Sequence, residues 1–189
     1  MITTLDEKTA LVLIDLQNMV VQLPLAHPVD AVIANSAKLL AAFRAAELPV
    51  VIVNVNPIGS AASKTRKDSN NRSSGEALPK EALEITPEIK VEDGDIFITK
   101  QTWGAFYQTQ LHNELQEKGI TGIVLAGIAT SIGVEGTARS ANEFGYNIAF
   151  ASDAMTDLFL DAHTNSFKYI FPRLGEVGTT DDIIEKLMK

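Results

Sequence analysis

The sequence lacks cysteine altogether, although it runs to 189 residues. This absence excludes disulfide bonds, cysteine-ligated zinc, iron–sulfur clusters and thiol nucleophiles in one step. The sequence is also short of basic residues, with 16 Lys and Arg against 24 Asp and Glu and a net charge of −8. A surface that binds nucleic acid needs positive charge, so we expect no nucleic-acid partner.

Long hydrophobic runs are missing as well. The first residues, MITTLDEKTA, carry no basic cluster, and the apolar run that follows, LVLID, is shorter than a signal peptide needs. No apolar run approaches the roughly 20 residues that span a bilayer. We therefore expect a cytoplasmic protein with no membrane partner. Its length suits a single domain over residues 1–189.

Two phosphate-binding fingerprints are also absent. The turn after the first apolar run reads DLQNMV, without the GxGxxG of dinucleotide-binding folds, and there is no P-loop. The three histidines, His27, His112 and His163, have no spacing to one another or to acids that is typical of a metal site. We expect neither a cofactor nor a bound metal.

What the sequence does contain is a regular alternation of two patterns. Short runs rich in Val, Ile and Leu predict strands, and the first five read as continuously apolar, which is typical of parallel strands buried on both faces. Amphipathic stretches between them predict helices. The expected strands cover residues 10–14, 50–55, 95–99, 122–126, 147–151 and, more weakly, 174–177, and the expected helices cover 30–46, 106–118, 134–144, 162–170 and 180–187. This order indicates a three-layer, doubly wound α/β domain, with Thr180 as the cap of the last helix.

The segment 57–79 interrupts this alternation. It is rich in Ser, Asn and Gly, and it carries Lys64, Arg66, Lys67 and Arg72. A loop of this length in a compact domain is usually a lid, a binding loop or an assembly arm, and a solvated excursion is an equal alternative. Its positive charge favours contact with an anionic ligand or with an acidic neighbouring subunit.

Polar residues follow the expected strands at their carboxyl ends, where ligands bind in folds of this type. Asp15 comes directly after four aliphatic residues, and Lys100 follows the third strand. A buried carboxylate needs a partner, so we expect Asp15 and Lys100 to pair, either as an acid–base couple or as a purely structural ion pair. The glycine-rich stretch GIATSIGVEG would offer amides to a developing oxyanion. Ser131 within it is a conceivable nucleophile, but the sequence places no histidine to activate it.

Further side chains at the same edge are candidates for shaping a substrate pocket. Gln17 and Asn54 stand at the ends of the first two strands, and Thr130 lies in the glycine-rich stretch. Trp103 and Phe106 follow the third strand, where they would form an aromatic wall or simply pack under the next helix. Both interpretations of the aromatic residues stay open at this point.

Four motifs in a fixed order resemble the isochorismatase-like hydrolase superfamily, often called cysteine hydrolases. They are LVLIDLQN, TKQTWGAF, VLAGIATSIGVEGTARSANEFGY and ASDA, and the similarity extends from about Thr9 to the final helix. The resemblance implies a six-stranded parallel sheet of order 3-2-1-4-5-6 flanked by helices. It also implies a small-molecule substrate and assembly as a homodimer or homotetramer.

The resemblance assigns roles to particular positions. The family's catalytic aspartate falls on Asp15 and its lysine on Lys100, and the peptide bond that is typically cis and shapes the oxyanion site falls on Ile128–Ala129. The catalytic cysteine of the amidase members falls on Gly133 in the pattern TSIGV. Without a thiol, the acyl-enzyme route of the amidases is excluded.

Two subgroups of the family match a missing cysteine. In isochorismatases proper, the aspartate protonates a vinyl ether and water completes the cleavage, but they typically read G-x-Y-A-H where this sequence has GIATS at residues 127–131. The second subgroup, bacterial proteins with GI-[SA]-T-x-IGVE-x-TAR and K-x-x-WGAF, is the nearer match. Nicotinamidase is disfavoured by the missing D-x-H metal motif, since Asn54 and Asn56 stand in that region.

These observations predict a hydrolase that acts on a small carboxylated molecule through Asp15 and Lys100, by vinyl-ether or related C–O or C–N hydrolysis. The alternative is a non-catalytic binding protein that lost its nucleophile at Gly133. A scaffold protein that uses the 57–79 segment has less support.

Overall fold

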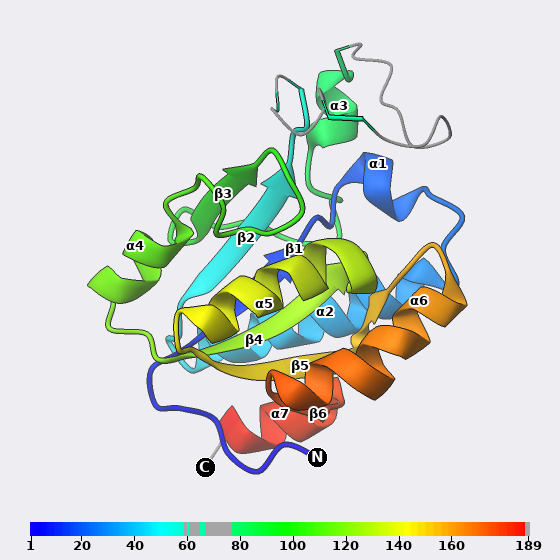
Figure 1. The fold of residues 1–189 in the computed structure, drawn as a ribbon. Coiled ribbons are helices and arrows are strands. Elements are labelled where there is room, and N and C mark those ends of the chain that lie inside the picture. Colours follow the sequence, from blue (N-terminus) through cyan, green and yellow to red (C-terminus); the bar gives the residue numbers. More distant parts are fainter. Residues whose placement is uncertain (59, 61–64, 67–76, 188–189) are drawn as a thin grey trace.

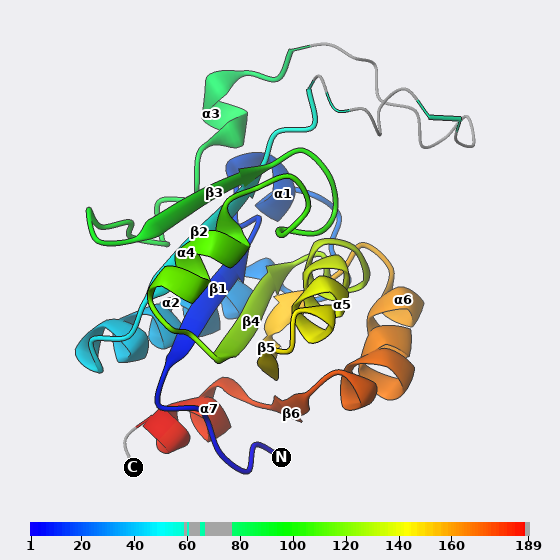
Figure 2. The same cartoon turned by 60° about the vertical axis from the view of Figure 1, so that its left-hand side comes forward.

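A six-stranded parallel sheet of order β3-β2-β1-β4-β5-β6 forms the centre of the molecule (Figures 1 and 2). The computed structural model describes residues 1–58, 60, 65–66 and 77–187. The strands are β1 (Thr9–Ile14), β2 (Val50–Val55), β3 (Ile96–Lys100), β4 (Gly122–Ile128), β5 (Asn147–Thr156) and β6 (Glu176–Gly178). The strand order reverses at β1, so in a fold of this type the carboxyl ends of β1 and β4 mark the expected ligand position. The expected fold class and strand order are confirmed.

Helices cover both faces of this sheet. One face packs against α2 and α7, and the other packs against α4 and α5, with α6 beside them (Figure 1). Their bounds are α1 (Asn18–Val21), α2 (Val29–Ala45), α3 (Lys80–Leu83), α4 (Leu111–Glu117), α5 (Glu135–Glu143), α6 (Leu160–Asn165) and α7 (Thr180–Leu187). The short helices α1 and α3 were not expected from the sequence.

The central strand β1 explains why the apolar runs are continuous. Every residue of β1 is buried, with Leu11 and Leu13 in the core under α2, and Val12 and Ile14 in the core under α5. A strand in the middle of a three-layer domain has no solvent-facing side, so both residue parities must be apolar. This packing on both faces holds β1 rigidly, and with it the residues that follow its carboxyl end.

The third strand departs from this expectation. β3 was expected to be apolar and buried throughout, but it lies at the edge of the sheet and alternates. Ile98 is buried while Phe97 is 51 % exposed. The expected helix at 106–118 likewise begins only at Leu111, with Gln110 at its cap position. The Thr109 hydroxyl, one residue earlier, accepts the Leu111 N–H at 3.2 Å.

Two other expected helices and one cap need smaller corrections. The chain makes a π-helical turn over Thr130–Val134 before α5, and a second over Ser166–Ile170 after α6. The cap of α7 is Thr179 rather than Thr180. The Thr179 hydroxyl accepts the Asp182 N–H at 3.2 Å, and Asp182 accepts the Thr179 N–H at 2.9 Å in return.

Much of the basic segment 57–79 lies outside the described residues. Lys64, Lys67 and Arg72 belong to that part, so their expected contact with an anion or a subunit stays a prediction. Arg66 is described and is exposed. Among the described residues, every helix is too short or too polar to cross a bilayer.

Candidate active site

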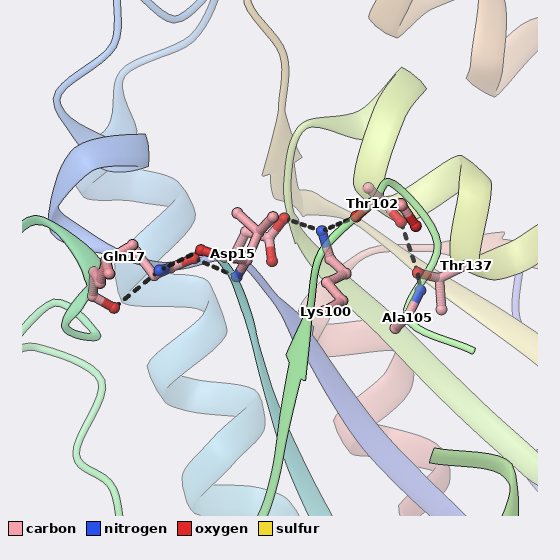
Figure 3. A network of polar contacts seen from close by, with 9 residues as sticks. Asp15, Gln17, Lys100, Thr102, Ala105 and Thr137 are labelled. Carbon is pink, nitrogen blue, oxygen red and sulfur yellow. Dashed lines mark hydrogen bonds and ion pairs between the residues drawn. The ribbon is translucent and has the colours of Figure 1, made fainter. Parts of the chain in front are cut away.

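A buried ion pair joins the carboxyl ends of β1 and β3. Asp15 follows the last residue of β1 in a left-handed conformation with φ 52°, which aspartate tolerates better than most residues, and its N–H donates to Val53 O at 2.9 Å. Lys100, the last residue of β3, donates from Nζ to Asp15 Oδ2 at 2.5 Å and to Thr102 O at 3.2 Å (Figure 3). The two residues that the sequence singled out are therefore in direct contact.

The pair is almost completely removed from solvent. Asp15 is 6 % exposed and Lys100 is 2 % exposed. Burial raises the pKa of the Asp15 carboxyl from 3.8 to about 6, because loss of hydration outweighs the opposing effect of the Lys100 charge. The second carboxylate oxygen, Oδ1, is buried without a hydrogen-bond partner among the described residues. A carboxyl in this state suits proton transfer near neutral pH.

Gly133 lies directly against this carboxylate. A Cβ atom at Gly133 would stand 3.2 Å from Asp15 Oδ2 and 2.9 Å from Ile14 Cγ2, which is closer than two such atoms normally approach. The residue belongs to the π-helical turn that follows the cis peptide bond Ile128–Ala129. A side chain at this position would press against Ile14 and the Asp15 carboxylate, so the close packing here favours glycine.

Comparison with known proteins identifies the family of this chain. The family description "Isochorismatase domain" matches residues 9–182. The chain belongs to the isochorismatase family. The isochorismatase family protein YwoC of Bacillus subtilis is 40 % identical over 185 residues, which cover 96 % of this chain and 95 % of YwoC.

Two further relatives extend this comparison. The structure of an isochorismatase family protein from Burkholderia thailandensis aligns with 100 % of both chains at 41 % identity and a TM-score of 0.92. The ureidoacrylate amidohydrolase RutB of Variovorax paradoxus is 30 % identical over 169 residues, covering 80 % of this chain and 67 % of RutB. The fold and the hydrolase family are thus shared along nearly the whole chain.

Several residues expected to touch substrate in this isochorismatase-family chain hold the backbone instead. Gln17 is fully buried, and its amide donates to Val55 O at 3.1 Å and Leu83 O at 2.9 Å while accepting the Val55 N–H at 2.7 Å. Thr130 is also fully buried, and its hydroxyl donates to Thr156 O at 3.0 Å. Both were expected to bind substrate, and in the structure both bond to backbone groups, Gln17 to those of β2 and α3 and Thr130 to that of β5.

The aromatic wall is likewise not formed as expected. Phe106 is 7 % exposed and packs in the core against Phe144 and Tyr146, so the packing interpretation is the correct one for this residue. Trp103 is 65 % exposed. Asn54 at the end of β2 is half-buried, and its Oδ1 has no partner among the described residues, which leaves it open as a substrate contact.

Two backbone amides of the glycine-rich turn already donate hydrogen bonds within the protein, which leaves fewer of its amides for an oxyanion. The Ser131 N–H donates to Asp157 Oδ2 at 2.7 Å, and the Ile132 N–H donates to Ala129 O at 3.1 Å. These amides are engaged inside the protein. The turn itself stays a candidate oxyanion site through the amides around Ala129 and Gly133.

A histidine pair beside this turn was missed by sequence reasoning. The His27 and His163 rings lie 4.6 Å apart between centroids. Their Nδ1 atoms contact the hydroxyls of Thr156 at 3.0 Å and Thr130 at 2.8 Å. Burial lowers the pKa of His163, helped by His27 and opposed by Asp157. The two residues are far apart in the sequence, and no spacing rule could have joined them. Within the part of the chain that is described, no group of three His, Asp or Glu residues forms a metal site.

Proposed function

We propose that this isochorismatase-family hydrolase cleaves a small carboxylated molecule without a thiol nucleophile, with Asp15 as the proton donor and acceptor. The chain contains no cysteine, so any reaction must use other groups. The observation that carries the proposal is the Asp15 carboxyl itself. One oxygen is held by Lys100, and the other is buried without a partner among the described residues.

The raised pKa of Asp15 supports a general-acid step. With a pKa of about 6, about a tenth of the molecules carry a protonated Asp15 at pH 7. In vinyl-ether hydrolysis the Asp15 O–H gives its proton to the terminal vinyl carbon, and the resulting oxocarbenium ion takes up water. The hemiketal then breaks down to a ketone and an alcohol, and the water proton returns to Asp15.

Lys100 supports the choice of an anionic substrate. Asp15 and Thr102 O take two of its three N–H donors within the described residues, so a third donor is available for a substrate oxygen. The ammonium also stabilises the Asp15 carboxylate after the proton has left. RutB is an amidohydrolase, and hydrolysis of a related C–N bond is the variant of this proposal that it favours.

A binding protein without catalysis is the second candidate, and the burial of the ion pair favours it. A pair that is almost closed to solvent could be kept because it stabilises the fold. The two candidates differ in what Asp15 does when a ligand is present.

The deciding experiment is a screen of small carboxylates, including enol ethers and ureido acids, for thermal-shift binding and for turnover. For any substrate found, Asp15→Asn is expected to lower kcat at least about 10²-fold, because the proton donor is lost. Asp6→Asn, at the opposite end of the sheet, is the matched control and should keep wild-type turnover. Binding without turnover by the wild type would favour the second candidate, and unchanged kcat in folded Asp15→Asn would contradict the mechanism.

A further inference from the structure

Thr137 on α5 makes two hydrogen bonds that connect separate parts of the candidate active site. The residue is fully buried. Its hydroxyl donates to Gly133 O at 2.7 Å and accepts the Ala105 N–H at 3.0 Å. Figure 3 shows the Thr137 hydroxyl turned toward Ala105, in the loop that follows Lys100. The hydroxyl thus ties the helix that follows Gly133 to the loop that follows Lys100.

Both ends of this bridge lead back to the Asp15 carboxylate. On one side, Lys100 reaches Asp15 and is bonded to Thr102 O in the same loop as Ala105. On the other side, Gly133 faces Asp15, because a Cβ atom there would stand 3.2 Å from Oδ2. Hydrogen bonds thus connect Asp15, Lys100 and the loop with Thr137 and Gly133, and Gly133 in turn lies beside the Asp15 carboxylate.

The loop after Lys100 and helix α5 approach each other so closely that the Thr137 bridge between them has little freedom to change length. A Cβ atom at Gly104 would lie 3.0 Å from Gly136 O, which is tighter than ordinary van der Waals contact. A threonine hydroxyl that bonds only the carbonyl four residues earlier is common in helices and has no wider effect. The second bond, to Ala105, is what joins the helix to the loop here.

We propose that Thr137 is a positioning residue that fixes the gap between the Lys100 loop and the Gly133 turn and thereby keeps water away from the Asp15 carboxyl. The consequence for turnover rests on the proposed function, whereas the structural role does not. Without the hydroxyl, the Ala105 N–H and Gly133 O lose their partner in a buried place, and the loop must move or admit water.

The test is the titration of the Asp15 carboxyl, followed by 13C NMR in the ligand-free protein and assigned with Asp15→Asn. Thr137→Val removes the hydroxyl at nearly constant shape and is expected to lower the pKa of Asp15 by about half a unit or more, toward the ordinary value. The direction is downward because burial is the larger influence on this carboxyl. Thr137→Ser keeps the hydroxyl and should titrate like the wild type.

The matched control is Thr180→Val. Thr180 belongs to α7, on the face of the sheet opposite α5. It is also fully buried, and its hydroxyl donates to Asp153 Oδ1 at 2.8 Å. This variant should lose comparable stability and leave Asp15 unchanged. If Thr137→Val does not fold, Gly104→Ala pushes the loop from the helix and is expected to lower the pKa of Asp15 in the same way.

Three results would overturn the inference. They are an unchanged Asp15 titration in both Thr137→Val and Gly104→Ala, an equal shift in Thr180→Val, and a shift in Thr137→Ser as large as in Thr137→Val. Because the titration needs no substrate, its outcome is independent of the proposed function. A shifted titration combined with full activity of Asp15→Asn would leave Thr137 as a positioning residue and reject the reaction.

Discussion

Carboxylates at the two ends of the central sheet lie in opposite environments. At the carboxyl end, Asp15 is buried, its pKa is raised, and one oxygen has no partner among the described residues. At the amino end, a cavity of about 390 Å³ is lined by Asp6 and Glu176, among others. There Asp6 accepts bonds from Thr121 at 2.5 Å and from Asn147 at 3.0 Å, and Thr3 donates twice to Glu176.

This contrast shows that room for a ligand and readiness for chemistry are separate properties. The amino-end cavity is roomy, but hydrogen bonds from Thr3 lower the pKa of Glu176 and hold it charged. The carboxyl end holds a group whose protonation changes near neutral pH. This contrast supports the proposed chemistry at Asp15 rather than in the amino-end cavity, which lies between the N-terminal segment and the amino ends of the strands.

The largest expected difference between the two ends is in the free energy of unfolding. Lys100→Met leaves the Asp15 carboxylate buried without its cation and should cost about 3–5 kcal/mol at pH 7. Asp6→Asn at the amino end disturbs half-exposed hydrogen bonds and should cost about 1 kcal/mol. Urea denaturation of both variants measures the difference. Equal losses would mean that the ion pair is no more critical than a surface bond.

The pH dependence of stability should also differ in sign between the two ends. The pKa of Asp15 is 3.8 ordinarily and about 6 when folded, so the folded protein binds more protons in this window and its stability falls as the pH rises through it. The free energy of unfolding is expected to fall by about 3 kcal/mol as the pH rises through this window. The pKa of Glu176 is lowered, so its contribution is present above the ordinary pKa and is lost as the pH falls through the folded value.

Urea denaturation between pH 4 and pH 7 tests this sign. The stability of the wild type relative to Asp15→Asn should decline toward pH 7, whereas its stability relative to Glu176→Gln should not. A wild-type curve that runs parallel to the Asp15→Asn curve would contradict the raised pKa.

The smallest expected effect concerns glycine at the two ends. Gly133→Ala places a methyl group 2.9 Å from Ile14 Cγ2 and should cost about 1–3 kcal/mol, because that strand is packed on both faces. Gly94, at the amino end of β3, has open space within 4 Å of its Cβ position, so Gly94→Ala should change stability by less than about 0.5 kcal/mol. Thermal or urea unfolding separates the two, and a neutral Gly133→Ala would show that the turn adapts freely.

Much of the fold was predictable because its signals are local. The apolar run before Asp15 predicts a strand buried on both faces, and the structure confirms it at every residue of β1. The edge position of β3 was not predictable in this way. Phe97 reads as a core residue in the sequence, and its exposure follows from the position of β3 at the edge of the described sheet.

The residues of the candidate site were also only partly predictable from the sequence. Asp15 and Lys100 were predictable because each ends a strand and the ends of parallel strands meet at one edge. Gln17 and Phe106 lie at the same edge, but the direction of each side chain follows from its neighbours, and both turn inward. The role of Thr137 also escaped the sequence, because Ala105 reaches it only through folding.

The sequence by itself determined that any reaction here proceeds without a thiol, because composition does not change on folding and no cysteine exists at Gly133 or elsewhere. It also determined which carboxylate stands at the end of the first strand. Only the tertiary structure decided that this carboxylate is desolvated, paired on one oxygen and, among the described residues, without a partner on the other. Desolvation is the combined effect of all surrounding atoms, and those atoms come from separate parts of the chain, among them β2, β3 and the turn before α5.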